Sequence, residues 1–235
     1  MKQTFGWRVF STCSLFTLIA GSAVLAQDPK PTYPGMAPLS QYLMSDRDAE
    51  IALARSAAPE AISHDAEILI LEKDGYKTAV PGKNGFVCVV ERSWMSNFDS
   101  PQYWNPKLRG PICFNPQAAR SILPITFKRT MLVLAGHTKS EIMEAMAADV
   151  RNKQLPGLEP GAMSYMMSRA AFLDDSAGHW IPHLMFYTAV GVDWGSDLPD
   201  SPVMLNPQFQ GKPEPIDVLM IPAGRWSDGT AAPLM

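Results

Sequence analysis

The sequence lacks the local signatures that identify the common catalytic sites. It contains no GxSxG, no Walker A loop, no GxGxxG, no HExxH and no CxxC motif. These absences argue against the ordinary α/β-hydrolase, P-loop, Rossmann, zincin and thioredoxin-like proteins, whose chemistry needs those residues at those spacings. They leave open a site that the fold assembles from residues distant in the sequence.

The sequence also lacks a large excess of charge of either sign. The chain has 20 Lys and Arg against 23 Asp and Glu, with no run of basic residues. Proteins that bind nucleic acid or anionic lipid by electrostatics carry a basic patch, so we expect neither partner. The composition, 46% apolar, is that of a globular protein, and about 200 residues are enough to bury a single core.

The N-terminal segment has the parts of a secretory signal peptide. Lys2 and Arg8 form a positive region, residues 10–25 form an apolar run, and Ala26 fits a small-residue cleavage site. The run is shorter than the roughly 18 to 20 residues of a spanning helix. We therefore predict that residues 1–26 are cleaved off and that the mature protein is exported, periplasmic or secreted, without a membrane span. An uncleaved anchor is the alternative.

Cysteine is nearly absent from the expected mature chain. Cys13 belongs to the predicted signal peptide, which leaves Cys88 and Cys113 as an even pair. In an exported protein such a pair predicts a disulfide bond. Two separate buried thiols are the alternative, since the sequence does not show whether the Cα atoms lie within bonding distance.

A Pro-rich segment separates the predicted signal peptide from the rest. Residues 27–38 contain Pro and Gly without apolar periodicity, which is typical of an extended linker. We expect a single domain over residues 39–235. Its first predicted element is a helix that begins after Ser45 or Asp46 and ends at Pro59.

Short apolar runs predict strands in the remainder of the domain, at residues 66–71, 76–80, 86–90, 162–168, 184–190 and 216–221. Asn84 and Gly85 tolerate the positive φ values of tight turns. We therefore expect the second and third of these strands to pair as an antiparallel hairpin.

Apolar residues recur at helical spacing mainly in the middle of the chain, which predicts helices there. Residues 116–124 are expected to be helical. Residues 125–135 fit a buried helix or a strand, and their length favours a helix. Thr138 with Glu141 forms a capping box for a helix that continues to residue 150. The last two helices should form a hairpin. The sum is an α+β domain with a mainly antiparallel sheet and an inserted helical hairpin.

Two of the four histidines lie close together in the sequence GHWIPH. Regular structure does not bring His179 and His183 to one ion, because Pro182 is tolerated only in the first turn of a helix and a strand separates the Cα atoms by roughly 13 Å. In a loop, the two histidines with Asp174 or Asp175 would form a site for a divalent metal. The alternative is that both histidines are hydrogen-bonded wall residues beside a core strand.

The segment between Cys88 and Cys113 is aromatic and irregular. It carries Trp94, Tyr103 and Trp104, followed by Arg109. If the loop exposed these rings, they would form a binding platform beside the guanidinium. The alternative, that the rings cover one face of the sheet and complete the core, is favoured by the apolar area that aromatic rings bury.

Four strings of the sequence, NGFVCVVERSW, WNPKLRGPICFNP, EPGAMSYMMS and GHWIPHLMFY, resemble a family of signal-peptide-bearing bacterial proteins to which no activity is assigned. The resemblance covers residues 49–226. It implies export and a single domain, and it transfers no catalytic residue. We therefore predict an exported binding or accessory domain with a small ligand or a protein partner. A metal-dependent enzyme centred on His179 and His183 is the alternative.

Overall fold

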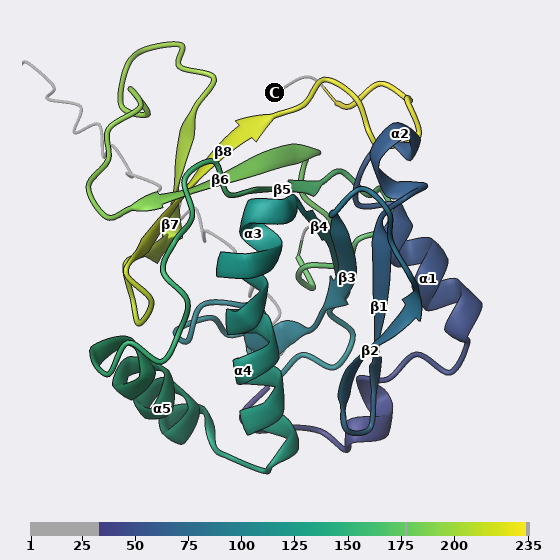
Figure 1. Ribbon diagram of the computed structural model, residues 1–235, viewed down its shortest axis with the longest axis vertical. Helices are drawn as coiled ribbons and strands as arrows, with labels where there is room; N and C mark the ends of the chain where they lie inside the picture. Colours follow the sequence, from purple (N-terminus) through teal and green to yellow (C-terminus); the bar gives the residue numbers. More distant parts are fainter. Residues whose placement is uncertain (1–32, 177, 234–235) are drawn as a thin grey trace, which may run out of the picture. The chain divides into compact units, whose positions relative to one another are not determined.

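The computed structural model describes residues 33–176 and 178–233, which form an α+β domain around one sheet (Figure 1). The eight strands have the order β2-β1-β3-β4-β5-β6-β8-β7, and every neighbouring pair is antiparallel except β1 with β3. The predicted fold class is confirmed. The predicted signal peptide, residues 1–26, lies outside the described residues.

The strands are β1 (Glu67–Glu72), β2 (Gly75–Val80), β3 (Val87–Glu91), β4 (Gly110–Phe114), β5 (Met163–Met166), β6 (His183–Ala189), β7 (Met204–Gln210) and β8 (Ile216–Pro222). The helices are α1 (Arg47–Arg55), α2 (Glu60–Ser63), α3 (Pro116–Ser121), α4 (Leu123–Leu134) and α5 (Lys139–Arg151). Most of these elements lie where the apolar pattern of the sequence predicts them.

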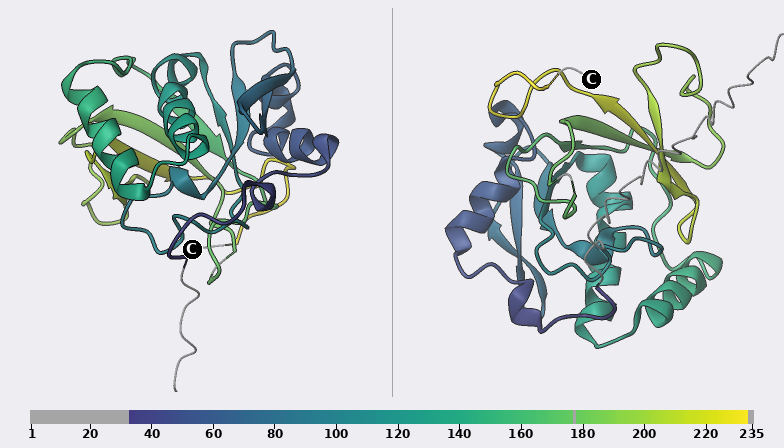
Figure 2. Two further views of the ribbon diagram at one scale, coloured as in Figure 1. Left: turned by 90° about the horizontal axis from the view of Figure 1, so that it is seen from below. Right: turned by 180° about the vertical axis from the view of Figure 1, so that it is seen from behind.

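Helices cover the sheet on both faces (Figure 2). On one face, Val89 of β3 belongs to the same apolar cluster as Ala118 of α3. On the other face, the neighbouring Val90 belongs to a cluster with Ala54 of α1. Because successive side chains of a strand point to opposite faces, β3 is buried from both sides. Helix α5 packs beside α4.

The helix ends follow the predicted capping residues. The Asp46 side chain accepts hydrogen bonds from the amides of Asp48 and Ala49 at the start of α1. Thr138 and Glu141 form the reciprocal capping box that begins α5. These side chains satisfy amides that have no partner within the helix, which is why the boundaries were readable from local sequence.

The predicted hairpin at Asn84 and Gly85 is wrong. Strand β1 pairs antiparallel with β2 on one side and parallel with β3 on the other, so β2 and β3 do not pair. The turn itself forms: Gly85 has φ of +77°, and the Asn84 side chain donates to the Ile62 carbonyl at 2.8 Å. The reason lies in β1, whose residues from Ile68 to Leu71 are buried. Such a strand belongs inside a sheet, with a partner on each edge.

Two strands fall where the sequence predicted none. All five residues of β4 are buried, although Pro111 removes a backbone donor from the middle of the sheet. A proline normally argues against a central strand, which hid this one. Strand β7, Met204–Gln210, lies between the apolar runs at residues 184–190 and 216–221, where the pattern predicts no strand.

The predicted disulfide bond between Cys88 and Cys113 is confirmed. The two residues are directly opposite each other on β3 and β4, with their Cα atoms 3.9 Å apart. Both are buried in the cluster beneath α1. A buried disulfide bond is compatible with an oxidising compartment.

The described part of the Pro-rich segment packs against the domain. Met36 and Ala37 contact an apolar cluster that includes Tyr42. The Tyr33 hydroxyl donates to the Asp175 carboxylate at 2.6 Å. Among the described residues, no helix is both long enough and apolar enough to cross a membrane.

Candidate functional site

A small hollow lies where the chain between β5 and β6 folds back on the sheet. Its lining includes Pro111 of β4, Met166 of β5 and His183 of β6, together with Ser168, Leu173 and Trp180 from the connecting loop. We call it the His183 hollow. It has room for about one water molecule, so it accepts one small group and not a whole drug-sized ligand.

His183 supplies an unusual polar atom to this apolar wall. The residue is only 4% exposed, and its Nδ1 lies 2.8 Å from the Ile181 carbonyl oxygen. A carbonyl can only accept, so Nδ1 carries the proton and Nε2 keeps its lone pair. Burial lowers the pKa of the imidazole, which keeps the ring neutral.

The second ring nitrogen of His183 is the free one. No described residue donates a hydrogen bond to Nε2. Nε2 is not completely buried, so part of this atom stays accessible to solvent or to a ligand. His183 lines the hollow among mostly apolar residues, and Nε2 is the hydrogen-bond acceptor that its ring can offer to a ligand.

The hydroxyl of Ser168 is already committed to the protein. The Ser56 Oγ donates to the Leu53 carbonyl at 2.6 Å, and the Ser56 and Ser168 Oγ atoms are 2.6 Å apart. Because the Ser56 proton is used, Ser168 donates to Ser56 Oγ and accepts from the Ala170 amide. Ser168 thus has no proton to pass to His183, and the two do not form a nucleophile and base pair.

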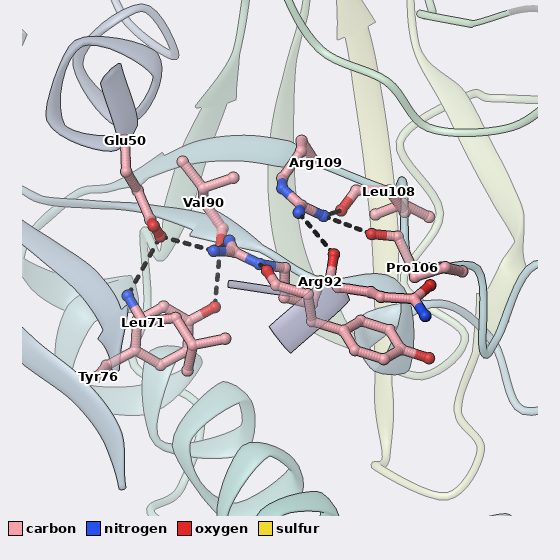
Figure 3. Close-up of polar contacts among 10 residues, drawn as sticks. Glu50, Leu71, Tyr76, Val90, Arg92, Pro106, Leu108 and Arg109 are labelled. Carbon is pink, nitrogen blue, oxygen red and sulfur yellow. Dashed lines mark hydrogen bonds and ion pairs between the residues drawn. The ribbon is translucent and has the colours of Figure 1, made fainter. Parts of the chain in front are cut away.

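The wall of the hollow is held by Arg109. Arg109 and Phe172 exchange two backbone hydrogen bonds, at 2.8 and 2.9 Å, which places Leu173 against the sheet. The Arg109 guanidinium donates to the carbonyls of Pro106 and Leu108, both at 2.8 Å (Figure 3). Burial and the nearby Arg92 lower its pKa to about 10. All of these side-chain hydrogen bonds go to backbone carbonyls, so Arg109 supports the structure of the loop.

A buried ion pair lies beside Arg109 in the same close-up (Figure 3). The Arg92 Nη2 atom is 2.8 Å from the Glu50 Oε1 atom, and the two side chains are 0% and 2% exposed. Arg92 also donates to the carbonyls of Tyr42 and Val90. Glu50 accepts from the Leu71 amide at 3.1 Å. The pair ties α1 and the N-terminal segment to β1 and β3.

The aromatic residues predicted as a binding platform lie in the core. Trp94, Tyr103 and Trp104 are 0%, 1% and 6% exposed and belong to one cluster beneath α4 and α5. The Trp94 indole donates to Thr130 on α4 at 3.0 Å. The rings therefore complete the core, and only the half-buried Arg109 lies near the His183 hollow.

The predicted metal ligands do not come together. His179 is exposed, whereas His183 is buried and faces the hollow. Asp174 accepts from the Ser176 amide and hydroxyl, and Asp175 is bound by other side chains. In the described part of the chain, no three His, Cys, Asp or Glu residues are grouped to hold an ion. The metal-site hypothesis thus has no geometric support from these residues.

Glu91 belongs to no motif of the sequence, but the structure gives its carboxylate an unusual setting. Glu91 is half-buried under α4 and accepts a hydrogen bond of 2.7 Å from Thr126. Burial raises the pKa of Glu91 to about 7, against the opposing effects of Thr126 and Arg129. The sequence did contain one indication of this burial. Glu91 alternates in phase with Val87 and Val89, so its side chain lies on the face of the sheet that α3 and α4 cover.

Comparisons with protein family models, with curated proteins and with solved structures give no match for this chain. The family resemblance inferred from the sequence stays a prediction.

Proposed function

We propose that this protein is an exported binding domain that receives the end of a small uncharged ligand in the His183 hollow. One observation carries the proposal: a buried, neutral imidazole lines the hollow, and its Nε2 atom has no donor among the described residues. A hydrogen bond to this acceptor in mostly apolar surroundings is stronger than the same bond in bulk water. A ligand with one N–H or O–H donor beside an apolar group would form that bond.

The surroundings of Nε2 favour an uncharged ligand. Apart from Ser168 and His183, the residues that line the hollow are apolar, and none of the lining residues carries a charge. A charged group would lose its hydration there without gaining an opposite charge. The ligand class is therefore an alcohol, a phenol or an amide, with the rest of the molecule outside the hollow and next to the half-buried Trp180.

Binding is favoured over catalysis by the chemistry of the lining. An enzyme site needs several titratable groups that converge on one reacting atom. His183 is the one titratable residue that lines the hollow, and the Ser168 proton is committed to Ser56. Export is supported by the signal-like N-terminal sequence and by the buried disulfide bond.

The test is a titration of the oxidised mature domain with 1-butanol, phenol and two charged analogues of butanol, butyrate and butylamine. The readout is the ¹⁵N resonance of His183 Nε2, which responds directly to hydrogen bonding. We expect saturable shifts with the neutral donors and none with the charged analogues. The exposed His179→Ala is the matched control and should keep the response.

Two outcomes would overturn the proposal. One is the absence of any saturable shift with the neutral donors in a protein that is folded. The other is one equivalent of bound zinc that both His179→Ala and His183→Phe remove, since this would favour the metal-dependent enzyme.

A further inference from the structure

The loop between β6 and β7, residues 190–203, concentrates the exposed apolar side chains of the protein. Among the described residues, six large apolar side chains are exposed, and four of them lie in this loop. They are Val190, Val192, Trp194 and Leu198, which are 55%, 41%, 45% and 64% exposed. The loop projects beyond the sheet at the top of the molecule (Figures 1 and 2). We call it the β6–β7 loop.

The β6–β7 loop is held in shape by its own hydrogen bonds. The Gly191 amide donates to the Asp217 carboxylate of β8 at 2.8 Å. The Gly195 amide donates to Asp193 at 2.6 Å, and the Leu198 amide donates to the Gly195 carbonyl at 3.2 Å. Because these hydrogen bonds fix the loop backbone in the free protein, a partner would meet little cost of ordering the backbone on binding.

Glycine is required at the centre of the β6–β7 loop. Gly195 has φ of +73°, and a Cβ atom there would lie 2.9 Å from the Leu198 Cδ1 atom. Trp194 is steadied from the other side by the Phe186 ring, with a centroid distance of 5.5 Å. The Trp194 ring is thus supported by its contact with Phe186, and the loop backbone is constrained at Gly195.

The charged side chains of the β6–β7 loop are all negative. Residues 190–211 contain Asp193, Asp197 and Asp200 but no Lys or Arg. All three carboxylates are exposed, and none forms an ion pair with a described residue. An anionic membrane or nucleic acid would be repelled by this surface, and so would the same loop of a second copy.

We propose that the β6–β7 loop is the docking surface for a partner protein that presents an apolar face bordered by Lys and Arg. Apolar contact supplies affinity, and the three carboxylates select for the basic border. The loop lies at the opposite end of β6 from His183, roughly 20 Å along the strand. Partner docking is therefore independent of the proposed ligand hollow, and both can be occupied together.

The test uses a dye-labelled amphipathic helical peptide of leucine and lysine, with a leucine and glutamate peptide as its charge-reversed control. Fluorescence anisotropy with the oxidised mature domain should show saturable binding of the basic peptide alone, weakened by added salt. Val192→Ser and Leu198→Ser should each weaken binding by about tenfold. Met131→Ser removes an equally exposed side chain on α4 and should change nothing.

A second variant tests the electrostatic part. The triple change Asp193→Asn, Asp197→Asn and Asp200→Asn keeps the side-chain acceptor for Gly195 and should remove most of the salt dependence. Equal binding by Leu198→Ser and Met131→Ser would overturn the proposal. So would equal binding of the two peptides, dimerisation that Leu198→Ser abolishes, or binding of the loop to phosphatidylcholine vesicles.

Discussion

The Glu50 carboxylate on helix α1 and the Arg92 guanidinium beyond strand β3 form a salt bridge of 2.8 Å that is almost completely removed from water. The Arg92 guanidinium makes its other hydrogen bonds to backbone carbonyls, including that of Tyr42 at 2.7 Å. This one contact joins the first helix, the N-terminal segment and the central sheet. It lies next to Arg109, which holds the wall of the His183 hollow.

Removing one partner of this pair should be more harmful than removing both. Arg92→Met leaves the Glu50 charge buried without compensation, and we expect a loss of about 3 to 5 kcal/mol in the free energy of unfolding. The double change Glu50→Leu and Arg92→Met should cost less than the sum of the single changes. Urea denaturation of the four proteins measures the difference, and additive losses would contradict the prediction.

The disulfide bond should contribute a large share of the stability. The bond closes a loop with a sequence separation of 25 residues. In the chain-entropy model such a loop stabilises the native state by roughly 3 to 4 kcal/mol. The double change Cys88→Ala and Cys113→Ala should lower the free energy of unfolding by that amount. Reduction of the wild-type protein should give a similar loss, whereas the variant should be insensitive to reductant.

Glu91 should make stability fall as the pH rises. Its pKa is raised from 4.5 to about 7 in the folded protein, so the folded state binds the proton more tightly. The contribution is fully present below pH 4.5 and is lost as the pH rises through about 7. The difference between the two pKa values corresponds to roughly 3 kcal/mol, an upper bound because Glu91 keeps some contact with solvent.

Glu91→Gln should flatten this dependence. Urea denaturation between pH 4 and pH 8 measures it, and Glu144→Gln, an exposed change on α5, is the control. A pH profile of Glu91→Gln that parallels the wild type would contradict the assignment.

His183 should act in the opposite direction. Burial lowers its pKa below 6.5 in the folded protein, so the unfolded chain binds this proton more tightly. Its contribution is fully present above pH 6.5 and is lost as the pH falls through the folded value. A ¹⁵N titration should show the neutral ring with the proton on Nδ1 at pH 6.5. A titration midpoint at or above 6.5 would show that the ring is not buried as described.

The local sequence was sufficient for elements whose partners are near in the chain. The amides at the start of α1 and α5 are satisfied by Asp46 and by Thr138 with Glu141, which lie within four residues of them. Strand β1 likewise follows from its own apolar run. These features depend on chemistry that a short window of sequence contains.

The local sequence did not determine which strands pair with each other. Asn84 and Gly85 indicate a turn, and the turn exists, but the choice of partner for β3 was made by β1 and β4. Pairing in a sheet depends on which strands must be buried on both faces. That choice is a competition among all the strands and is not encoded at any single turn.

The candidate site shows the same division. From sequence, His179 and His183 are equivalent, and Trp94, Tyr103 and Trp104 fit either a surface platform or a core. Only the fold decides that His183 is buried with a free Nε2 atom and that the rings are covered. Apolar patterning and capping residues specified the class of fold and the helix ends, because these depend on composition and local hydrogen bonding. The cysteine pair predicted the disulfide bond, but the bond also required the pairing of β3 with β4. The tertiary structure alone decided which side chains face a hollow, because burial is a property of contacts between residues far apart in the chain.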